Sequence, residues 1–121
     1  MNIRLVSKIV FVMALFSATF LFAQDSASVT GTVRDSSGAT VANAQVTVSA
    51  ADRGINRETT TNGDGDYSVA ALPPGSYNII VVAQGFKRFQ AKDVILRVAQ
   101  KARVDVPLQV GAAATEVTVE G

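Results

Sequence analysis

The chain has 121 residues, of which 48% are hydrophobic, and its 11 basic and 10 acidic side chains give a formal net charge of +1. This balance lacks the basic surplus with which proteins bind nucleic acid, so no nucleic-acid partner is expected. The sequence contains no cysteine and no histidine. Their absence excludes disulfides and thiolate metal sites, and it removes the commonest general base and the commonest transition-metal ligand.

The first 23 residues have the layout of a signal peptide. Arg4 and Lys8 precede an apolar stretch over residues 9–22, and small Ala23 is followed by polar residues. This stretch is shorter than the about 20 apolar residues of a membrane-spanning helix. We therefore expect export with cleavage after Ala23 and no membrane span afterwards. The remaining residues suffice for one small domain.

Beyond Gln24, short segments of alternating apolar and polar residues predict strands. A predicted strand over residues 28–33 ends at a type I turn that has Asp35 first and Gly38 fourth. Residues 45–49 alternate as a strand with one solvated face, and the polar residues 57–61 predict an edge strand.

The second half of the chain continues the pattern after a turn. Predicted strands cover residues 67–70, 76–83, 94–98 and 102–110, and the second of them should be the most buried because it is apolar on both faces. The spacing predicts an all-β fold, a seven-stranded antiparallel β-sandwich over residues 24–110.

Residues 111–121 form a linker with one more short strand. The small residues 111–114 predict a hinge, and residues 116–120 predict a strand without a hairpin partner. Such a strand is suited to pairing with the sheet of a partner protein by strand addition.

Five turn motifs punctuate these strands, at residues 31–38, 43–46, 61–67, 72–77 and 85–86. Their order and spacing resemble the carboxypeptidase regulatory-like domain, a transthyretin-like and carbohydrate-binding-like β-sandwich, over roughly residues 29–108. The resemblance implies structural roles for the motif positions and no catalytic ones, because that domain accompanies carboxypeptidases without containing the zinc site. The positions that match the motifs are Gly31, Asp35, Gly38, Ala44, Gly65, Tyr67, Leu72, Pro74, Gly75, Tyr77, Gly85 and Phe86.

Asn62, Asp64 and Asp66 alternate as the ligands of a calcium-binding loop do. The twelfth position of such a loop falls on Pro73, where a bidentate Glu belongs. A glycine-rich hairpin turn is the preferred interpretation, so no metal site is predicted. No Gly-x-Ser-x-Gly or Ser-x-x-Lys motif is placed at a strand-to-helix turn. We therefore expect no enzyme activity, no catalytic residue and no cofactor.

Basic and aromatic side chains alternate near residue 90. Lys87, Arg88 and Lys92 flank Phe86 and Phe89, which fits either a contact surface for an anionic partner or a solvated loop over two rings anchored in the core. The second interpretation is the commoner one. Carbohydrate binding is an alternative function, although the chain has no Trp on which a sugar could stack.

A signal peptide, this domain and a segment like residues 110–121 together resemble the N-terminal region of bacterial TonB-dependent receptor-like outer-membrane proteins. The leading hypothesis is a non-catalytic, exported interaction or scaffold domain, an accessory domain or fragment of such a receptor. Its expected location is the periplasm or the outer membrane, and its expected partner is the receptor or a periplasmic protein. The alternative hypothesis is a stand-alone secreted carbohydrate-binding module with a glycan as ligand.

Overall fold

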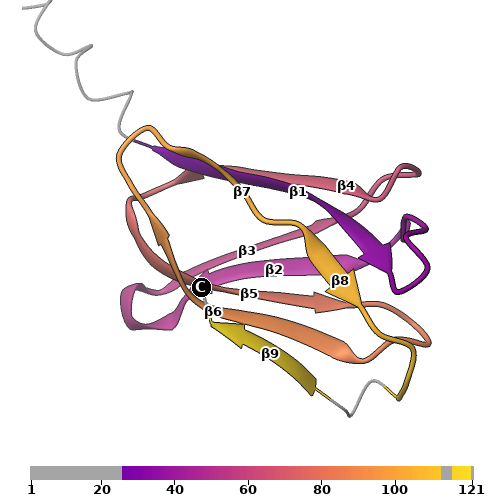
Figure 1. Cartoon of the computed structure of the whole chain (residues 1–121). Helices are drawn as coiled ribbons and strands as arrows, with labels where there is room; N and C mark the ends of the chain where they lie inside the picture. The colour runs from indigo at the N-terminus through magenta and orange to yellow at the C-terminus, as the bar shows by residue number, and fades with distance from the viewer. Residues whose placement is uncertain (1–25, 113–115, 121) are drawn as a thin grey trace, which may run out of the picture.

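The structure, a computed structural model, describes residues 26–112 and 116–120. The predicted signal peptide, residues 1–23, lies outside these ranges. Two β-sheets face each other across a shared core (Figure 1). The helical structure of the described residues is the short 3-10 turn η2 (Ala51–Arg53), and nothing in these ranges is a helix that could span a membrane.

The first sheet is built around β1 (Ala27–Asp35). On one side β1 pairs with β4 (Asp66–Leu72), which runs antiparallel to it. On the other side it pairs with β7 (Lys101–Arg103), and its last residues pair with β8 (Val106–Leu108). β7 and β8 both run parallel to β1, so the first strand of the domain pairs with strands that come late in the chain.

The second sheet has five strands. Their order is β3 (Ile55–Thr60), β2 (Gln45–Ala50), β5 (Gly75–Val82), β6 (Arg88–Leu96) and β9 (Glu116–Glu120). The first three pairs are antiparallel, and β9 is parallel to β6.

Inward-facing side chains of both sheets fill the core. On β2, Val46 and Val48 are fully buried while Gln45 is exposed, because successive side chains of a strand point to opposite faces. Burying one such aliphatic side chain stabilises the fold by about 1.5–3 kcal/mol. The largest fully buried side chains are Tyr77, Leu72, Ile79, Leu96, Leu108, Val29, Val33, Val46, Val48, Val81 and Val106.

The connections between strands gather at the two ends of the sandwich (Figure 1). Residues 36–44, 61–65 and 83–87 lie at one end, where the Val33 N–H donates to the Gly65 carbonyl (2.8 Å) and the Asn43 N–H donates to the Thr61 carbonyl (3.1 Å). The connections at the opposite end are residues 51–54, 73–74 and 97–100.

The predicted all-β sandwich is confirmed, but strand number and pairing differ from the prediction. Nine strands are described where the sequence predicts eight, seven in the sandwich and one at residues 116–120, and three strand pairs are parallel where an antiparallel sandwich was predicted. Residues 102–110 form two strands and not one, because the strand is interrupted at Val104 and Asp105. These two residues make hydrogen bonds to residues of other strands. The strand predicted at 94–98 begins earlier, at Arg88, and ends at Leu96.

Two further expectations are corrected by the sheet order. β5 is central and its inward residues are buried, but among residues 26–112 and 116–120 no third layer covers its outer face, and Val82 is 36% exposed. The strand at residues 116–120 is not unpartnered, because as β9 it joins the edge of its own second sheet.

Candidate functional site

The Asp35 carboxylate closes the turn after β1. Its Oδ1 accepts hydrogen bonds from the Ser37 N–H (2.9 Å), the Ala39 N–H (3.1 Å) and the Ser37 hydroxyl. The hydroxyl bond, helped by the backbone N–H groups, lowers the pKa of Asp35 below its ordinary value. Gly38 then takes a left-handed conformation, with φ of 87°. These contacts give Asp35 and Gly38 roles in the turn.

The Asn62 amide is engaged by the backbone of the 62–66 turn, and the Asp66 carboxylate is engaged by β1. Asn62 Oδ1 accepts the N–H groups of Asp64 and Asp66, both at 3.0 Å, and the Asp66 carboxylate accepts the Thr32 hydroxyl at 2.6 Å. Gly65 at the end of the turn is buried. Residues 26–112 and 116–120 contain no group of three or more His, Cys, Asp or Glu that could hold a metal ion. The geometry favours the hairpin interpretation over a calcium loop.

Tyr67 joins the first sheet to the break between β7 and β8. Its ring is buried, and its hydroxyl donates a hydrogen bond to the Val104 carbonyl. The same carbonyl approaches Gly31 so closely that a Cβ at this position would overlap it. Burial raises the pKa of the Tyr67 hydroxyl, and the nearby Asp105 carboxylate adds to the shift. The hydroxyl therefore stays protonated at physiological pH and keeps donating its hydrogen bond to the Val104 carbonyl.

Tyr77 has the corresponding role at the other end of the sandwich. Its hydroxyl donates to the Pro73 carbonyl, and the Arg53 guanidinium lies over its ring, 4.9 Å from the centroid. Arg53 also donates to the Pro74 carbonyl (2.9 Å) and the Ser76 carbonyl (3.3 Å). The guanidinium thus fixes the 73–76 turn from outside while the tyrosine fixes it from inside.

The remaining motif positions have packing or turn roles. Ala44 and Leu72 are fully buried. Gly85 has φ of 83°, and its carbonyl accepts the Gly111 N–H (3.2 Å). Phe86 is half-buried against the core and forms a β-bridge with Val110. The motif positions are therefore spread through both ends and the core, and they do not converge on one site.

The basic and aromatic cluster separates into core and surface. Phe89 is buried at 3% exposure, and Phe86 is half-buried and packs against the core. Lys87 and Arg88 are half-buried and Lys92 is exposed. This arrangement fits two rings anchored in the core with the cations above them.

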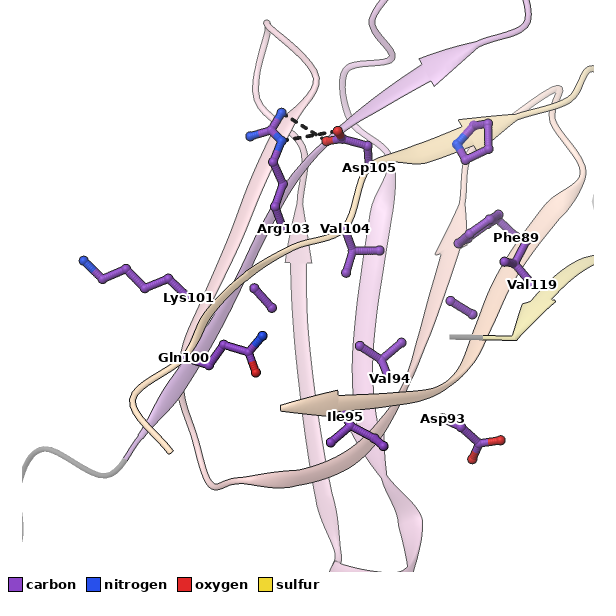
Figure 2. A pocket seen from close by; sticks show the side chains of 13 residues that line it. Phe89, Asp93, Val94, Ile95, Gln100, Lys101, Arg103, Val104, Asp105 and Val119 are labelled. Atoms are coloured by element: carbon purple, nitrogen blue, oxygen red, sulfur yellow. Dashed lines mark hydrogen bonds and ion pairs between the residues drawn. The ribbon is translucent and has the colours of Figure 1, made fainter. Parts of the chain in front are cut away.

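One concavity lies between the edges of the two sheets. It has a volume of about 580 Å³ and opens between β6 and β9 on one side and the β7–β8 segment on the other (Figure 2). The volume is within the range of small-molecule sites, roughly 300–1,000 Å³. Its apolar lining comes from Phe89, Ala91, Val94, Ile95, Ala102, Val104, Pro107 and Val119.

Two of the charged residues that line this cavity, Arg103 and Asp105, are paired with each other. Arg103 and Asp105 form an ion pair at 3.0 Å, drawn in Figure 2, and each side chain is about 60% exposed, at 62% and 60%. Asp105 also accepts the Thr32 N–H (3.0 Å), and this bond is the main cause that lowers the pKa of Asp105. Such a pair positions the β7–β8 break and offers no nucleophile with an adjacent base.

A second, polar concavity of about 270 Å³ lies beside the Arg53 turn. Its polar lining is formed by Ser49, Asp52, Ser76, Asn78 and Asp93. Asp93 has φ of 57°, at a β-bulge in which its N–H lies 3.4 Å from Asn78 Oδ1. Hydroxyl, amide and carboxylate groups of this kind can hydrogen-bond the hydroxyls of a sugar.

The sequence alone does not single out Arg53 and Asp105, which lie beside the polar concavity and in the lining of the apolar one. Arg53 lies in a predicted loop, and Asp105 lies within a predicted strand. Both act through partners more than 20 residues away, Pro74 and Thr32.

Comparisons with known proteins identify one family and several solved structures that share the fold. The family model described as "Carboxypeptidase regulatory-like domain" matches residues 28–109, more than half of the chain. Carboxypeptidase Z of Rattus norvegicus is 40% identical over 80 residues, which are 65% of this chain and 12% of the rat protein. The chain therefore spans only a small part of the curated relatives it matches.

Solved structures share the sandwich at low sequence identity. The TIE protein of Bacillus anthracis has a TM-score of 0.61 at 17% identity, covering 71% of this chain and 17% of that one. A "putative carbohydrate binding protein" of Bacteroides uniformis has 0.56 at 18% identity, covering 68% and 40%. Catechol 1,2-dioxygenase of Acinetobacter radioresistens has 0.57 at 14% identity, covering 82% and 58%. At these identities the likeness shows the fold alone.

Proposed function

Because the chain belongs to the carboxypeptidase regulatory-like domain family, we propose that it is a non-catalytic, exported interaction or scaffold domain. We further propose that it is the N-terminal accessory domain of a TonB-dependent receptor-like outer-membrane protein, located in the periplasm or at the outer membrane. The supporting observation is the use of its motif residues. Tyr67, Tyr77 and Asp35 each direct their polar atoms to backbone groups of the domain itself.

The cavity between β6, β9 and the β7–β8 segment supports the same proposal. Its lining is mostly apolar, and its Arg103–Asp105 pair is mutually neutralised. Catalysis of hydrolysis or group transfer requires an activated nucleophile or an acid and base at matched geometry. The lining residues provide a surface for contact and not such a constellation.

The test is the genomic sequence across and beyond the codon for Gly121, combined with fractionation of the native cells. We expect an open reading frame that continues into plug and barrel sequence, with the polypeptide in the outer-membrane fraction. A stop codon directly after Gly121, with the protein in the culture medium, would contradict the receptor assignment.

The second candidate function is glycan binding, favoured by the polar concavity beside Arg53. Since Tyr67 and Tyr77 are buried, neither ring is available for stacking. Recognition would depend on hydrogen bonds that Asn78 and Ser76 donate or accept and that the Asp93 carboxylate accepts. A bound glycan raises the melting temperature by mass action. The free energy of unfolding should rise by about 2.7 kcal/mol at a ligand concentration of 100 times Kd.

A melting screen with starch, xylan and cello-oligosaccharides tests this candidate. Asn78→Ala should abolish any shift, whereas Asn56→Ala, on the exposed strand β3 and outside the lining, should preserve it. The scaffold function predicts no shift with any glycan.

A further inference from the structure

The two sheets of the sandwich differ in width on the side of β7. The second sheet continues past β5 through β6 to β9, whereas the first sheet, in the described part of the chain, ends at β7 and β8 (Figure 1). The apolar concavity of about 580 Å³ lies in this gap, between β6 and β9 on one side and the β7–β8 segment on the other. We call this concavity the β7 groove. The sandwich is therefore open beside the edge of β7.

The walls of the β7 groove consist largely of apolar side chains that the sandwich covers only in part. Val94 on β6, and Ala102 and Val104 on the β7–β8 segment, are half-buried and pack against the core. Val119, which lies opposite Ala91 in the β6–β9 register, is 45% exposed. Removing such surface from water is favourable, so the walls favour a ligand with apolar groups.

The free edge of β7 supplies backbone hydrogen-bonding groups along the same groove. β7 pairs with β1 and, within residues 26–112 and 116–120, with no other strand. The Gln100 carbonyl accepts a hydrogen bond from β1 (2.9 Å), and the Val104 N–H donates one to the Thr30 carbonyl (2.8 Å). Because alternate residues of a strand direct their backbone groups to opposite sides, the N–H and C=O groups of Lys101 and Arg103 point away from β1. Edge groups of this kind can pair with an added strand.

The outer side of this edge carries basic side chains. The side chains of Lys101 and Arg103 point away from Val104, because successive residues of a strand face opposite ways (Figure 2). Arg103 is paired with Asp105, whereas the Lys101 ammonium forms no ion pair with any side chain that the structure describes. The other carboxylate of the lining, Asp93, belongs to β6 across the groove. A strand beside β7 therefore meets apolar groups on its inner face and an uncompensated positive charge on its outer face.

We propose that the β7 groove binds an extended segment of a partner protein as an added strand of the first sheet. This segment has apolar side chains at every second position, which face the walls of the groove, and acidic side chains between them, which face Lys101. A compact apolar molecule would leave the edge N–H and C=O groups of β7 unpaired, so the backbone edge favours a polypeptide. The proposal rests on the proposed interaction function and names its class of partner, and it does not depend on the receptor assignment.

The test titrates the full chain with the acetylated and amidated peptide Thr-Val-Glu-Val-Glu-Val-Thr. Its valines supply the apolar face, and its two Glu positions allow either strand direction. The reference peptide Thr-Val-Lys-Val-Lys-Val-Thr has the same apolar face and the opposite charge. Isothermal titration calorimetry measures the two affinities, and amide hydrogen exchange followed by NMR locates the contact.

We expect the acidic peptide to bind about fivefold more tightly than the basic one, because cross-strand charge pairs favour the first and oppose the second. The acidic peptide should slow the hydrogen exchange of the Lys101 and Arg103 amides about tenfold, since these groups become paired. Exchange on β3, the strand at the opposite edge of the second sheet, should stay unchanged.

A charge reversal on the edge provides a second measurement. Lys101→Glu should weaken binding of the acidic peptide and strengthen binding of the basic one, so that the order of the two affinities is reversed. Lys92→Glu makes the same charge change at an exposed residue of β6 outside the lining of the groove, and it should preserve the order. Both lysines are exposed, so both variants should keep the parental circular dichroism spectrum.

Three results would overturn the proposal: equal affinities for the two peptides, no binding of the acidic peptide at about 1 mM, or protection that maps to β3. Octanol serves as a compact apolar probe. If it shifts the methyl signals of Val94 and Val104 while the acidic peptide does not bind, the groove is a small-molecule site and the proposal is wrong. None of these results affects the genomic test of the receptor assignment, so the two failures can be distinguished.

Discussion

Gly75 has a backbone conformation that side chains resist. Its φ is 149°, and a Cβ built there would overlap the Arg53 guanidinium. Gly75→Val should therefore lower the free energy of unfolding by about 1–3 kcal/mol, as measured by chemical denaturation. The control is Gly63→Val, because a Cβ at Gly63 meets no atom within 4 Å. An unchanged midpoint for Gly75→Val would contradict the assigned conformation.

Ala71 is the opposite case, a side chain where glycine would be better. It has φ of 57° near the register shift of the β1–β4 pair. Ala71→Gly should raise the free energy of unfolding by about 0.5–1 kcal/mol, because it relieves the left-handed strain. Its neighbour Ala70, also exposed on β4, has no positive φ, so Ala70→Gly should lower stability by about 0.5–1 kcal/mol. Thermal melts that change in the same direction for both variants would refute this explanation.

At the scale of elements, the β7–β8 segment pairs with β1 along both short strands and comes nearest to its backbone at Gly31. Gly31→Ala would drive a methyl group into the Val104 carbonyl, which also accepts the Tyr67 hydroxyl. We expect a loss of about 2–3 kcal/mol and faster hydrogen exchange of the Val104 amide, which donates to the Thr30 carbonyl. Gly63→Ala is the control. Native exchange rates in Gly31→Ala would show that the contact is not limiting.

Asp105 makes the same attachment sensitive to acid. The Thr32 N–H and Arg103 hold its folded pKa below the ordinary value of 3.8, so its stabilising contribution is present above that value and is lost as the pH falls through the folded pKa. Asp105→Asn should lower the melting temperature at pH 7 and flatten the fall in stability below about pH 4. Asp64→Asn makes the same charge change away from this contact. A variant that keeps the parental acid slope would contradict the linkage.

The elements also show what sequence can and cannot predict. Local turn chemistry placed the reversals at Asp35, at residues 62–65 and at the Pro-Pro-Gly segment, because positive φ and Asx turns are written in neighbouring residues. The break at Val104 was not predicted, since its cause is a hydroxyl 37 residues away. The partner of β9 was not predicted either, because parallel pairing leaves no hairpin signal.

For the whole molecule, stability depends on the side chains that are buried between the two sheets. Leu72 is fully buried, and Leu72→Ala should cost about 2–5 kcal/mol, a large share of the marginal stability of a small domain. Val119→Ala, at a residue 45% exposed beside the large cavity, should cost much less. Calorimetry distinguishes the two, and similar losses would mean that the cavity wall is part of the core.

The two candidate sites are formed by the packing of separate strands and could therefore not be predicted from the sequence. Alternation correctly identified the one solvated face of β2, because a period of two along a strand separates its buried face from its exposed face. The two concavities exist only where separate strands approach, β6 against β7 and η2 against β5. No local pattern encodes these approaches.

The parallel pairing of β1 with β7 and β8 also determines when the domain can finish folding. Thr32 and Asp105, which bond across this seam, are 73 residues apart in the chain. Contacts of such high sequence separation are formed late, because the long loop between them must be closed first. A ribosome or a secretion channel that has released only the first 100 residues holds a chain whose first sheet still lacks one side. Folding is thereby postponed until almost the entire domain has emerged.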